Sequence, residues 1–234
     1  MAILLHNLVA RAPKLSDADA VTNLLKMCDI VEDGVSHYTE EDLLAEWQRP
    51  DFNLATDAWA IITNKDQFVG YASTSWNNEL MRVNMQACVH ASYRGRGIGT
   101  LLLRLAEVRA RQFAKYARPG VRVTLNNMVS HTNQRAKDLL EHEGYTLVSH
   151  SWRIIIETED IVLPASATST GYQQLRKHTL TLDVSFPCVT GTTRIYEPSG
   201  WYAVRQYDVY EKELRAGEVI YTDEPLGMGL VACQ

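Results

Sequence analysis

The sequence predicts an α/β fold in which a mixed sheet is covered by helices on both faces. Two observations predict it. Between residues 9 and 157 the spacing of apolar residues alternates between that of strands and that of helices, in the order β, α, α, β, β, β, α, β, α, β. A turn that contains three glycines, at residues 94–100, connects one of these strands to the longest helix.

Capping and turn residues delimit the elements before this turn. Ser16 and Asp17 are suited to cap a helix over residues 18–30. Thr39 begins a second helix over residues 40–48, which ends before Pro50. Strands are expected at residues 9–13, 59–63, 68–75 and 81–90.

The elements after the turn complete the sheet near residue 160. The long helix reaches residue 117, and Pro119 and Gly120 stop it. On this helix Glu107 precedes Arg111 by one helical turn, the spacing of a supporting ion pair. A strand at 121–125, a helix at 133–143 and one or two strands within 146–157 follow.

Composition excludes several classes of function. The formal charge of −5 argues against nucleic acid as a partner, since neutralising phosphates needs a basic face. The four cysteines contain no CxxC pair and are expected to be reduced thiols of a cytoplasmic protein. No signal peptide is expected, and no apolar run of about 18 residues predicts a membrane span. The seven histidines never show a metal-binding spacing, so no metal site is expected.

The glycine turn has the chemistry of an anion-binding site. Glycines allow positive φ angles and let backbone amides approach a ligand, and the helix that follows has a partial positive charge at its N-terminus. Arg94, Arg96 and the hydroxyl of Thr100 can add contacts to phosphate. The turn fits neither a dinucleotide fingerprint, whose third glycine is replaced by Thr100, nor a triphosphate loop, which needs a lysine.

Two segments resemble one known family. Residues 94–99, RGRGIG, fit the Q/R-x-x-G-x-G/A signature of the GCN5-related N-acetyltransferase (GNAT) family. Residues 133–145, NQRAKDLLEHEGY, resemble the family's N-x-x-A-x-x-L-Y-E-x-x-G-F segment. The resemblance covers residues 8–160 and implies an acyl-CoA N-acyltransferase fold with acetyl-CoA as the co-substrate.

The resemblance also implies the cofactor contacts. The strand before the turn would pair its backbone with the pantetheine arm through Ala87, Cys88 and Val89. The pyrophosphate would lie on the turn formed by Arg94, Gly95, Arg96, Gly97, Ile98, Gly99 and Thr100. Asn133 matches a family asparagine that contacts the cofactor, and it is equally suited to cap its helix. Cys88 is interpreted as a buried thiol and not as an acetylated intermediate.

The family's usual proton-transfer groups are missing. The tyrosine that often protonates the leaving thiolate is replaced by Leu140, and the two positions that hold a glutamate base in other members carry Met128 and Val83. Tyr196 matches the family tyrosine in a second copy of the segment and is the candidate catalytic residue. The acceptor is normally held by the first two helices and their loop, where Glu32 and Tyr38 are the candidate residues, beside Asp33 and His37.

The rest of the chain predicts a partial second unit. Glu141, Gly144, Val148 and Glu157 recur in the same order as Glu197, Gly200, Val204 and Glu213. The expected organisation is a GNAT domain at 8–160, a linker at 161–171, a partial β-α-β unit at 172–216 and a tail at 217–234, as in a tandem-domain member with a truncated second domain. An open half-sheet is expected to pack on the first domain or to form a homodimer.

Together these features predict an N-acetyltransferase. It would move an acetyl group from acetyl-CoA to a primary amine of a small molecule, by direct attack in a ternary complex. The missing acid and base favour an alternative, a catalytically silent CoA-binding sensor or scaffold domain.

Overall fold

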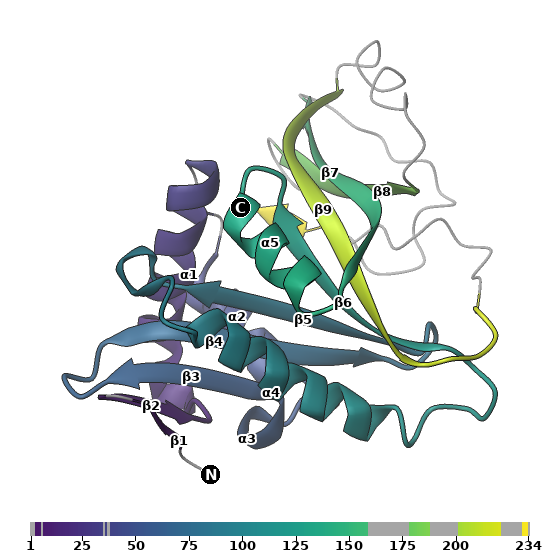
Figure 1. Ribbon diagram of the computed structural model, residues 1–234. Helices are drawn as coiled ribbons and strands as arrows, with labels where there is room; N and C mark the ends of the chain where they lie inside the picture. Colours follow the sequence, from purple (N-terminus) through teal and green to yellow (C-terminus); the bar gives the residue numbers. More distant parts are fainter. Residues whose placement is uncertain are drawn as a thin grey trace.

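The computed structural model describes residues 3–5, 7–34, 36, 38–158, 178–187, 201–220 and 231–233. In these residues ten strands form one sheet, in the order β1-β2-β3-β4-β5-β6-β9-β7-β8-β10 (Figure 1). Neighbouring strands are antiparallel except β5 and β6, which are parallel. The predicted mixed sheet is confirmed.

The elements have the following bounds. The strands are β1 (Ile3–Leu5), β2 (Leu8–Arg11), β3 (Ala58–Thr63), β4 (Phe68–Asn77), β5 (Arg82–Val89), β6 (Val123–Ser130), β7 (Thr146–Thr158), β8 (His178–Pro187), β9 (Trp201–Arg215) and β10 (Val231–Cys233). The α-helices are α1 (Ala18–Asp33), α2 (Glu40–Trp47), α3 (Leu54–Asp57), α4 (Ile98–Phe113) and α5 (Gln134–His142), and two 3-10 turns are η1 (Leu15–Asp17) and η2 (Ala91–Tyr93).

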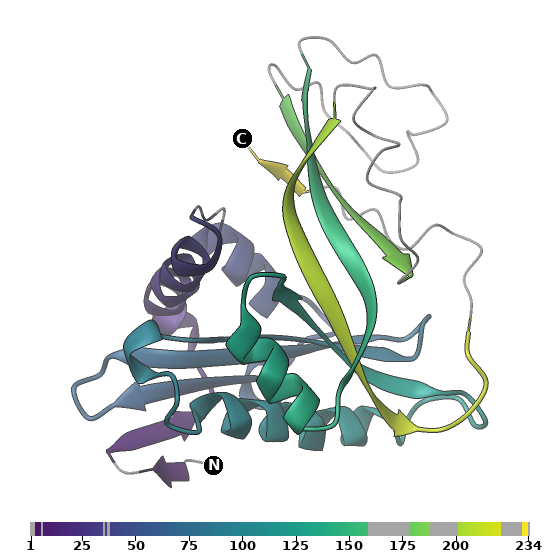
Figure 2. The same cartoon turned by 45° about the horizontal axis from the view of Figure 1, so that its top comes forward.

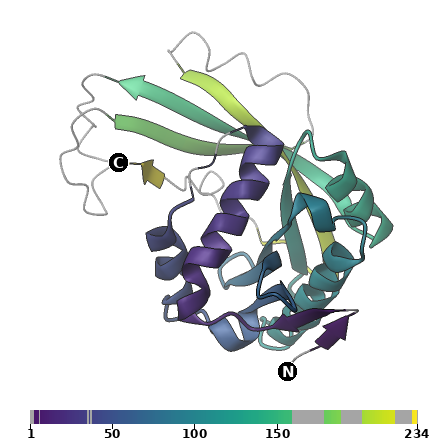
Figure 3. The ribbon, with the colours of Figure 1, turned by 90° about the vertical axis from the view of Figure 1, so that its left-hand side faces the viewer.

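Helices cover both faces of the sheet, as the sequence predicts. Helices α4 and α5 lie on one face, in front of the sheet in Figure 1, and α1 and α2 lie behind it, where Figure 3 shows α1 along its length. Each face has its own apolar core. Leu102 and Ala106 of α4 pack with Val83 of β5 on one side, and Leu24 of α1 packs with Tyr71 of β4 on the other.

The strand β9 lies within residues 172–216, for which the sequence predicts a partial unit packed on the first domain or on a partner. It is inserted between β6 and β7 and pairs with both, so it is part of the sheet of the first domain (Figure 2). The expected boundary near residue 160 therefore does not divide the described residues into two sheets. The internal repeat itself stays a prediction, because residues 188–200, where its helix was expected, and the linker at 161–171 lie outside the described residues.

Among the described residues, no helix combines the length and the apolar character that a membrane span requires.

Candidate functional site

The central feature of the site is the parting of β5 and β6. The two strands pair in parallel from Arg82 and Thr124 as far as Met85 and Asn127. Beyond that point β5 keeps its other neighbour β4 through residues 86–89, and β6 keeps β9 through residues 128–130. Among the described residues, the facing backbone edges of the two strands are thereby left without a strand partner. An extended ligand can form a strand-like ladder there. The edge of β5 consists of Gln86 and the three predicted residues Ala87, Cys88 and Val89.

The glycine turn lies at the mouth of this gap and leads into α4. Gly97 is the residue that precedes the helix, and its φ of 78° is in the left-handed region, which favours glycine. A Cβ at Gly97 would meet no atom within 4 Å, so the constraint is on the backbone conformation. Gly97 has no side chain to cap the helix, and no side-chain cap is seen among the described residues. The amides of its first turn therefore remain available to an anion.

Gly99 serves a different purpose from Gly97. Its backbone is not in the left-handed region, but a Cβ there would lie 2.9 Å from Cδ2 of Leu139 on α5. The absence of a side chain thus lets α4 and α5 approach closely. Helix α4 follows β5 along the chain, and α5 follows β6. The close packing of α4 on α5 therefore holds the N-termini of both helices at the gap between these strands.

Arg94 and Asn133 are joined across the gap by Glu32. Oε1 of Glu32, on the last turn of α1, accepts hydrogen bonds from Nη2 of Arg94 at 2.8 Å and from Nδ2 of Asn133 at 2.8 Å. Nε of Arg94 also donates to the carbonyl of Val89 at 3.1 Å. Oδ1 of Asn133 accepts from the amide of Ala136, so this side chain caps α5 as well. The predicted residue Glu32 therefore contacts the two cofactor candidates that follow the parted strands.

Arg96 lies on the outside of the turn. It is exposed, its guanidinium stacks on the ring of Tyr93 at 4.7 Å, and Nη2 reaches the carbonyl of Ser92 at 3.4 Å. Of the two predicted arginines, Arg96 is the one directed to solvent, and Arg94 is built into the wall of the gap.

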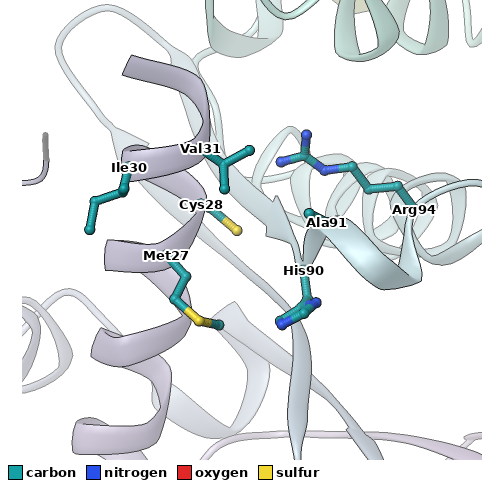
Figure 4. Close-up of a pocket in the computed structure, with 7 residues that line it drawn as sticks. All are labelled: Met27, Cys28, Ile30, Val31, His90, Ala91 and Arg94. Atoms are coloured by element: carbon teal, nitrogen blue, oxygen red, sulfur yellow. The ribbon is translucent and has the colours of Figure 1, made fainter. Parts of the chain in front are cut away.

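A cavity of about 270 Å³ opens between α1 and the end of β5 (Figure 4). In Figure 4 the guanidinium of Arg94 extends toward the α1 side of the cavity, where Val31 lies, and the sulfur of Cys28 points toward Ala91. The walls are mostly apolar. They are formed by Met27, Cys28, Ile30, Val31, His90, Ala91 and Arg94.

Cys28, in the wall of this cavity, contacts Cys88 of β5. The hydrogen bond that the Cys88 thiol donates to Cys28, together with burial, raises the pKa of the Cys88 thiol. Cys88 is therefore a neutral thiol at ordinary pH, and a thiol is a weak nucleophile. Acyl transfer through sulfur requires a thiolate, so the raised pKa favours a structural role for the half-buried Cys88.

Polar side chains gather on the α1–α2 face where the strands begin to part. Nε2 of Gln86, the first residue of β5 beyond its pairing with β6, donates a hydrogen bond to the hydroxyl of Tyr38. Burial raises the pKa of the Tyr38 hydroxyl, and the charge of Asp29 raises it further. The hydroxyl thus stays protonated and is available as a hydrogen-bond donor.

Glu46 of α2 is the carboxylic acid of this cluster. Its Oε1 accepts a hydrogen bond of 3.3 Å from Ser73, which is paired with Gln86 across β4 and β5. Burial raises the pKa of the Glu46 carboxyl above its ordinary value, and the contacts with Ser73 and Arg49 oppose this only in part. A carboxyl group with a raised pKa is a common feature of binding and proton-transfer sites.

The pKa of Glu46 predicts a pH-dependent effect of Glu46→Gln. A carboxyl pKa that is higher in the folded state means that ionisation disfavours folding, so the cost grows as the pH rises through the folded pKa. We therefore expect the glutamine variant to have a higher free energy of unfolding than the wild type at about pH 8, with the difference disappearing below the ordinary value of 4.5. Urea denaturation at several pH values measures this. Glu41→Gln, at an exposed position of the same helix, is the control and should show no such trend.

At the positions where other family members carry proton-transfer groups, this chain has apolar side chains. Leu140 is 2% exposed and packs in the core between the sheet and α4, and Val83 is buried in the same core. Met128 is exposed at the parted end of β6. Tyr196 lies outside the described residues, as do the side chains of Asp33 and His37.

Several polar groups near the site were not predicted from the sequence. Glu46, Gln86 and Arg205 belong to no motif, and Arg205 reaches Asp29 of α1 at 3.6 Å from strand β9. The one signal that could have found Glu46 and Gln86 is a polar residue within an otherwise apolar helix face or strand. Arg205 could not be found in this way, because its contact depends on the insertion of β9.

Comparison with known proteins decides the family. The model of the acetyltransferase (GNAT) family matches residues 18–145, which is more than half of the chain. The chain belongs to the GNAT acetyltransferase family. The predicted resemblance is thereby confirmed. As a GNAT enzyme, it is an acetyl-CoA-dependent N-acetyltransferase, and acetyl-CoA is its co-substrate.

Solved structures share the GNAT fold at low sequence identity. A GCN5-related N-acetyltransferase from Sphaerobacter thermophilus is 17% identical with a TM-score of 0.77, and the match covers 93% of this chain and 99% of that chain. A putative acetyltransferase from Salmonella typhimurium, solved with its cofactor acetyl-CoA, is 14% identical with a TM-score of 0.53, and the match covers 94% and 98%. A phosphinothricin acetyltransferase from Sinorhizobium meliloti, solved with acetyl-CoA, is 15% identical with a TM-score of 0.51, and the match covers 95% and 96%. No curated protein matches the chain.

Proposed function

We propose that this GNAT enzyme transfers the acetyl group to a primary amine of a small molecule, by direct attack of the amine on the thioester in a ternary complex. The observation that carries the proposal is the parting of β5 and β6 after Met85 and Asn127, with the hydroxyl of Tyr38 at the point of parting. A cofactor that enters along the gap brings its thioester to a polar cluster on the face covered by α1 and α2.

The cofactor side of the site uses mainly backbone groups. The edge at Ala87, Cys88 and Val89 pairs with the amides of the pantetheine arm, and the aliphatic part of the arm fits the apolar cavity beside α1. The amides at the start of α4 bind the diphosphate, because they have no helical partner and lie at the positive end of the helix dipole. Asn133 contributes from the opposite side of the gap.

The acceptor side uses charge and hydrogen bonding. Glu46 and Asp29 provide carboxyl groups for an ammonium ion, and Tyr38 provides a neutral hydroxyl that can donate to the substrate. Tyr38 and Glu46 are half-buried, which supports a small acceptor over a segment of a folded protein. Transfer forms the C–N bond and breaks the C–S bond. The proton lost by the amine balances the proton gained by the thiolate of CoA.

The test of the proposal is release of the CoA thiol with a panel of polyamines, aminoglycosides and amino acids. We expect turnover with at least one of these amines and saturation in both substrates. Binding of CoA without turnover on any small amine, together with acetylation of a lysine peptide, would contradict the small-molecule acceptor and leave the family assignment intact.

Tyr38→Phe tests the acceptor side. Removal of a hydroxyl that hydrogen-bonds the substrate costs about 1.4 kcal/mol, so kcat/KM for the amine should fall about tenfold. The Kd of CoA, measured by calorimetry without amine, should stay within about twofold, since the hydroxyl lies apart from the diphosphate turn. Tyr116→Phe is the matched control, because Tyr116 is 86% exposed. A Tyr38 variant that weakens CoA and leaves the amine kinetics unchanged would show that the residue belongs to the cofactor side.

A further inference from the structure

Three metal-ligating side chains meet on the α5 side of the sheet, apart from the polar cluster around Tyr38. They are His131, directly after β6, His150 of β7 and Asp208 of β9, and their ligating atoms all lie within 4.8 Å of one another. Nδ1 of His150 is 2.7 Å from Oδ1 of Asp208, and Nδ1 of His131 is 3.0 Å from the same oxygen. All three groups therefore converge on one point.

The convergence is a consequence of strand order. Asp208 lies directly opposite His150 in the pairing of β9 with β7 and opposite Val129 in the pairing of β9 with β6. His131 is two residues beyond Val129, which places it diagonally across from Asp208 on the same face. Because β9 lies between β6 and β7, one ligand comes from each of the three neighbouring segments. No spacing rule along the sequence could reveal such a set.

The exposed fractions of the three side chains also suit a metal site. The side chain of Asp208 is 3% exposed, whereas that of His131 is 49% exposed. An ion at the junction would have a buried carboxylate on one side and an open position for water on the other. Tetrahedral zinc ligands at 2.0–2.1 Å from the metal are separated by roughly 3.3 Å, so the contacts of Oδ1 with His150 and His131 need to open by about 0.6 and 0.3 Å.

Lys137 is the group that has to be reconciled with an ion here. Its Nζ is 3.0 Å from Oδ2 of Asp208 and 2.7 Å from the carbonyl of His131. Lys137 thus binds Oδ2, which also lies 3.1 Å from Nδ1 of His131, and leaves Oδ1 for a metal. Charged groups that hold the far oxygen of a ligating carboxylate are common around metal sites, where they orient the ligand. The positive charge of Lys137 nevertheless reduces the attraction for a cation.

We propose that His131, His150 and Asp208 bind one divalent transition-metal ion of the zinc type. Two imidazoles and one carboxylate are a donor set that zinc, cobalt and nickel accept, and calcium and magnesium do not prefer. The ion ties together β6, β9 and β7 beside α5. Its role is to hold β9 in place between β6 and β7, and it takes no part in acetyl transfer.

Titration of the full-length, tag-free protein with Co²⁺ and Zn²⁺ tests this. Cobalt absorption reports the coordination geometry, and calorimetry gives stoichiometry and affinity. We expect one ion per chain with a Kd below about 100 μM, and a thermal midpoint that rises with Zn²⁺. Absence of binding in this range would overturn the proposal, and the contacts of Asp208 with Lys137 and the two histidines would then be hydrogen bonds and ion pairs of the protein itself.

Variants locate the binding. His150→Ala and His131→Ala should each weaken Zn²⁺ at least tenfold, and Asp208→Asn should do so if the variant folds. His142→Ala is the matched control, since His142 is exposed beside Glu143 and lies outside the cluster, and it should bind as the wild type does. Equal affinity in the His131, His150 and His142 variants would show that the ion binds elsewhere and would overturn the assignment.

Thiol release with and without Zn²⁺ should give the same kcat, and loss of activity on chelation would contradict a purely structural role.

Discussion

Gly97→Asp is expected to weaken CoA binding at least 100-fold, about 2.7 kcal/mol. The substitution places a carboxylate at the residue before α4. Aspartate is a good N-cap, so its oxygen would bind the amides that we assign to the diphosphate, and its charge would repel the phosphates. No atom lies within 4 Å of the added Cβ, so the side chain itself fits. Calorimetry with CoA measures the loss.

Two further glycine variants separate charge from backbone strain. Gly97→Ala imposes a left-handed backbone on a residue with a side chain but adds no charge, and it should weaken CoA less than Gly97→Asp does. Gly120→Ala imposes a similar strain at a φ of 76°, where a Cβ also meets nothing, and it should leave the Kd unchanged. An unaltered Kd in Gly97→Asp would mean that the diphosphate does not lie on this turn.

The sequence was sufficient to predict those features of the structure that depend on residues close together along the chain. The turn at Gly97, the cap of Asn133 on α5 and the Glu107–Arg111 pair at 2.6 Å follow from neighbouring residues, and the structure confirms each of them. Helix faces were less certain. Val108 is apolar but 60% exposed, because the buried face of α4 is formed by residues that include Leu102, Ala106 and Ala110.

The sequence was insufficient where strands distant along the chain are neighbours. Nothing local to β9 indicates that it pairs with both β6 and β7, since strand pairing is decided by the fit of whole edges. The contacts of Asp208 with His131 and His150 and of Arg205 with Asp29 depend on that pairing. The acceptor cluster is likewise assembled from α2, β4, β5 and the loop before α2. A motif search identifies the cofactor turn but does not find the groups that surround it.

Arg109→Met is expected to lower the free energy of unfolding by about 3 kcal/mol. Asp57 at the end of α3 is 3% exposed, and Nε of Arg109 on α4 binds its Oδ1 at 2.6 Å. Removal of the guanidinium leaves a buried carboxylate without its counterion, although the amide of Asn53 still donates to it at 2.7 Å. The stacking of Arg109 on Phe113 at 4.2 Å is lost as well. Urea denaturation measures the change.

Two comparisons distinguish this buried pair from ordinary surface charge. Arg111→Met on the same helix breaks the more exposed pair with Glu107 and should cost at most about 0.5 kcal/mol. The double variant Asp57→Asn/Arg109→Met removes both charges and should recover part of the loss, because no uncompensated ion remains. If Arg109→Met costs no more than Arg111→Met, the carboxylate of Asp57 is reached by water and the pair does not fix α4 to α3. Since α4 begins at the cofactor turn, a loosened α4 should also weaken CoA in the Arg109 variant, and the double variant should restore that affinity in part.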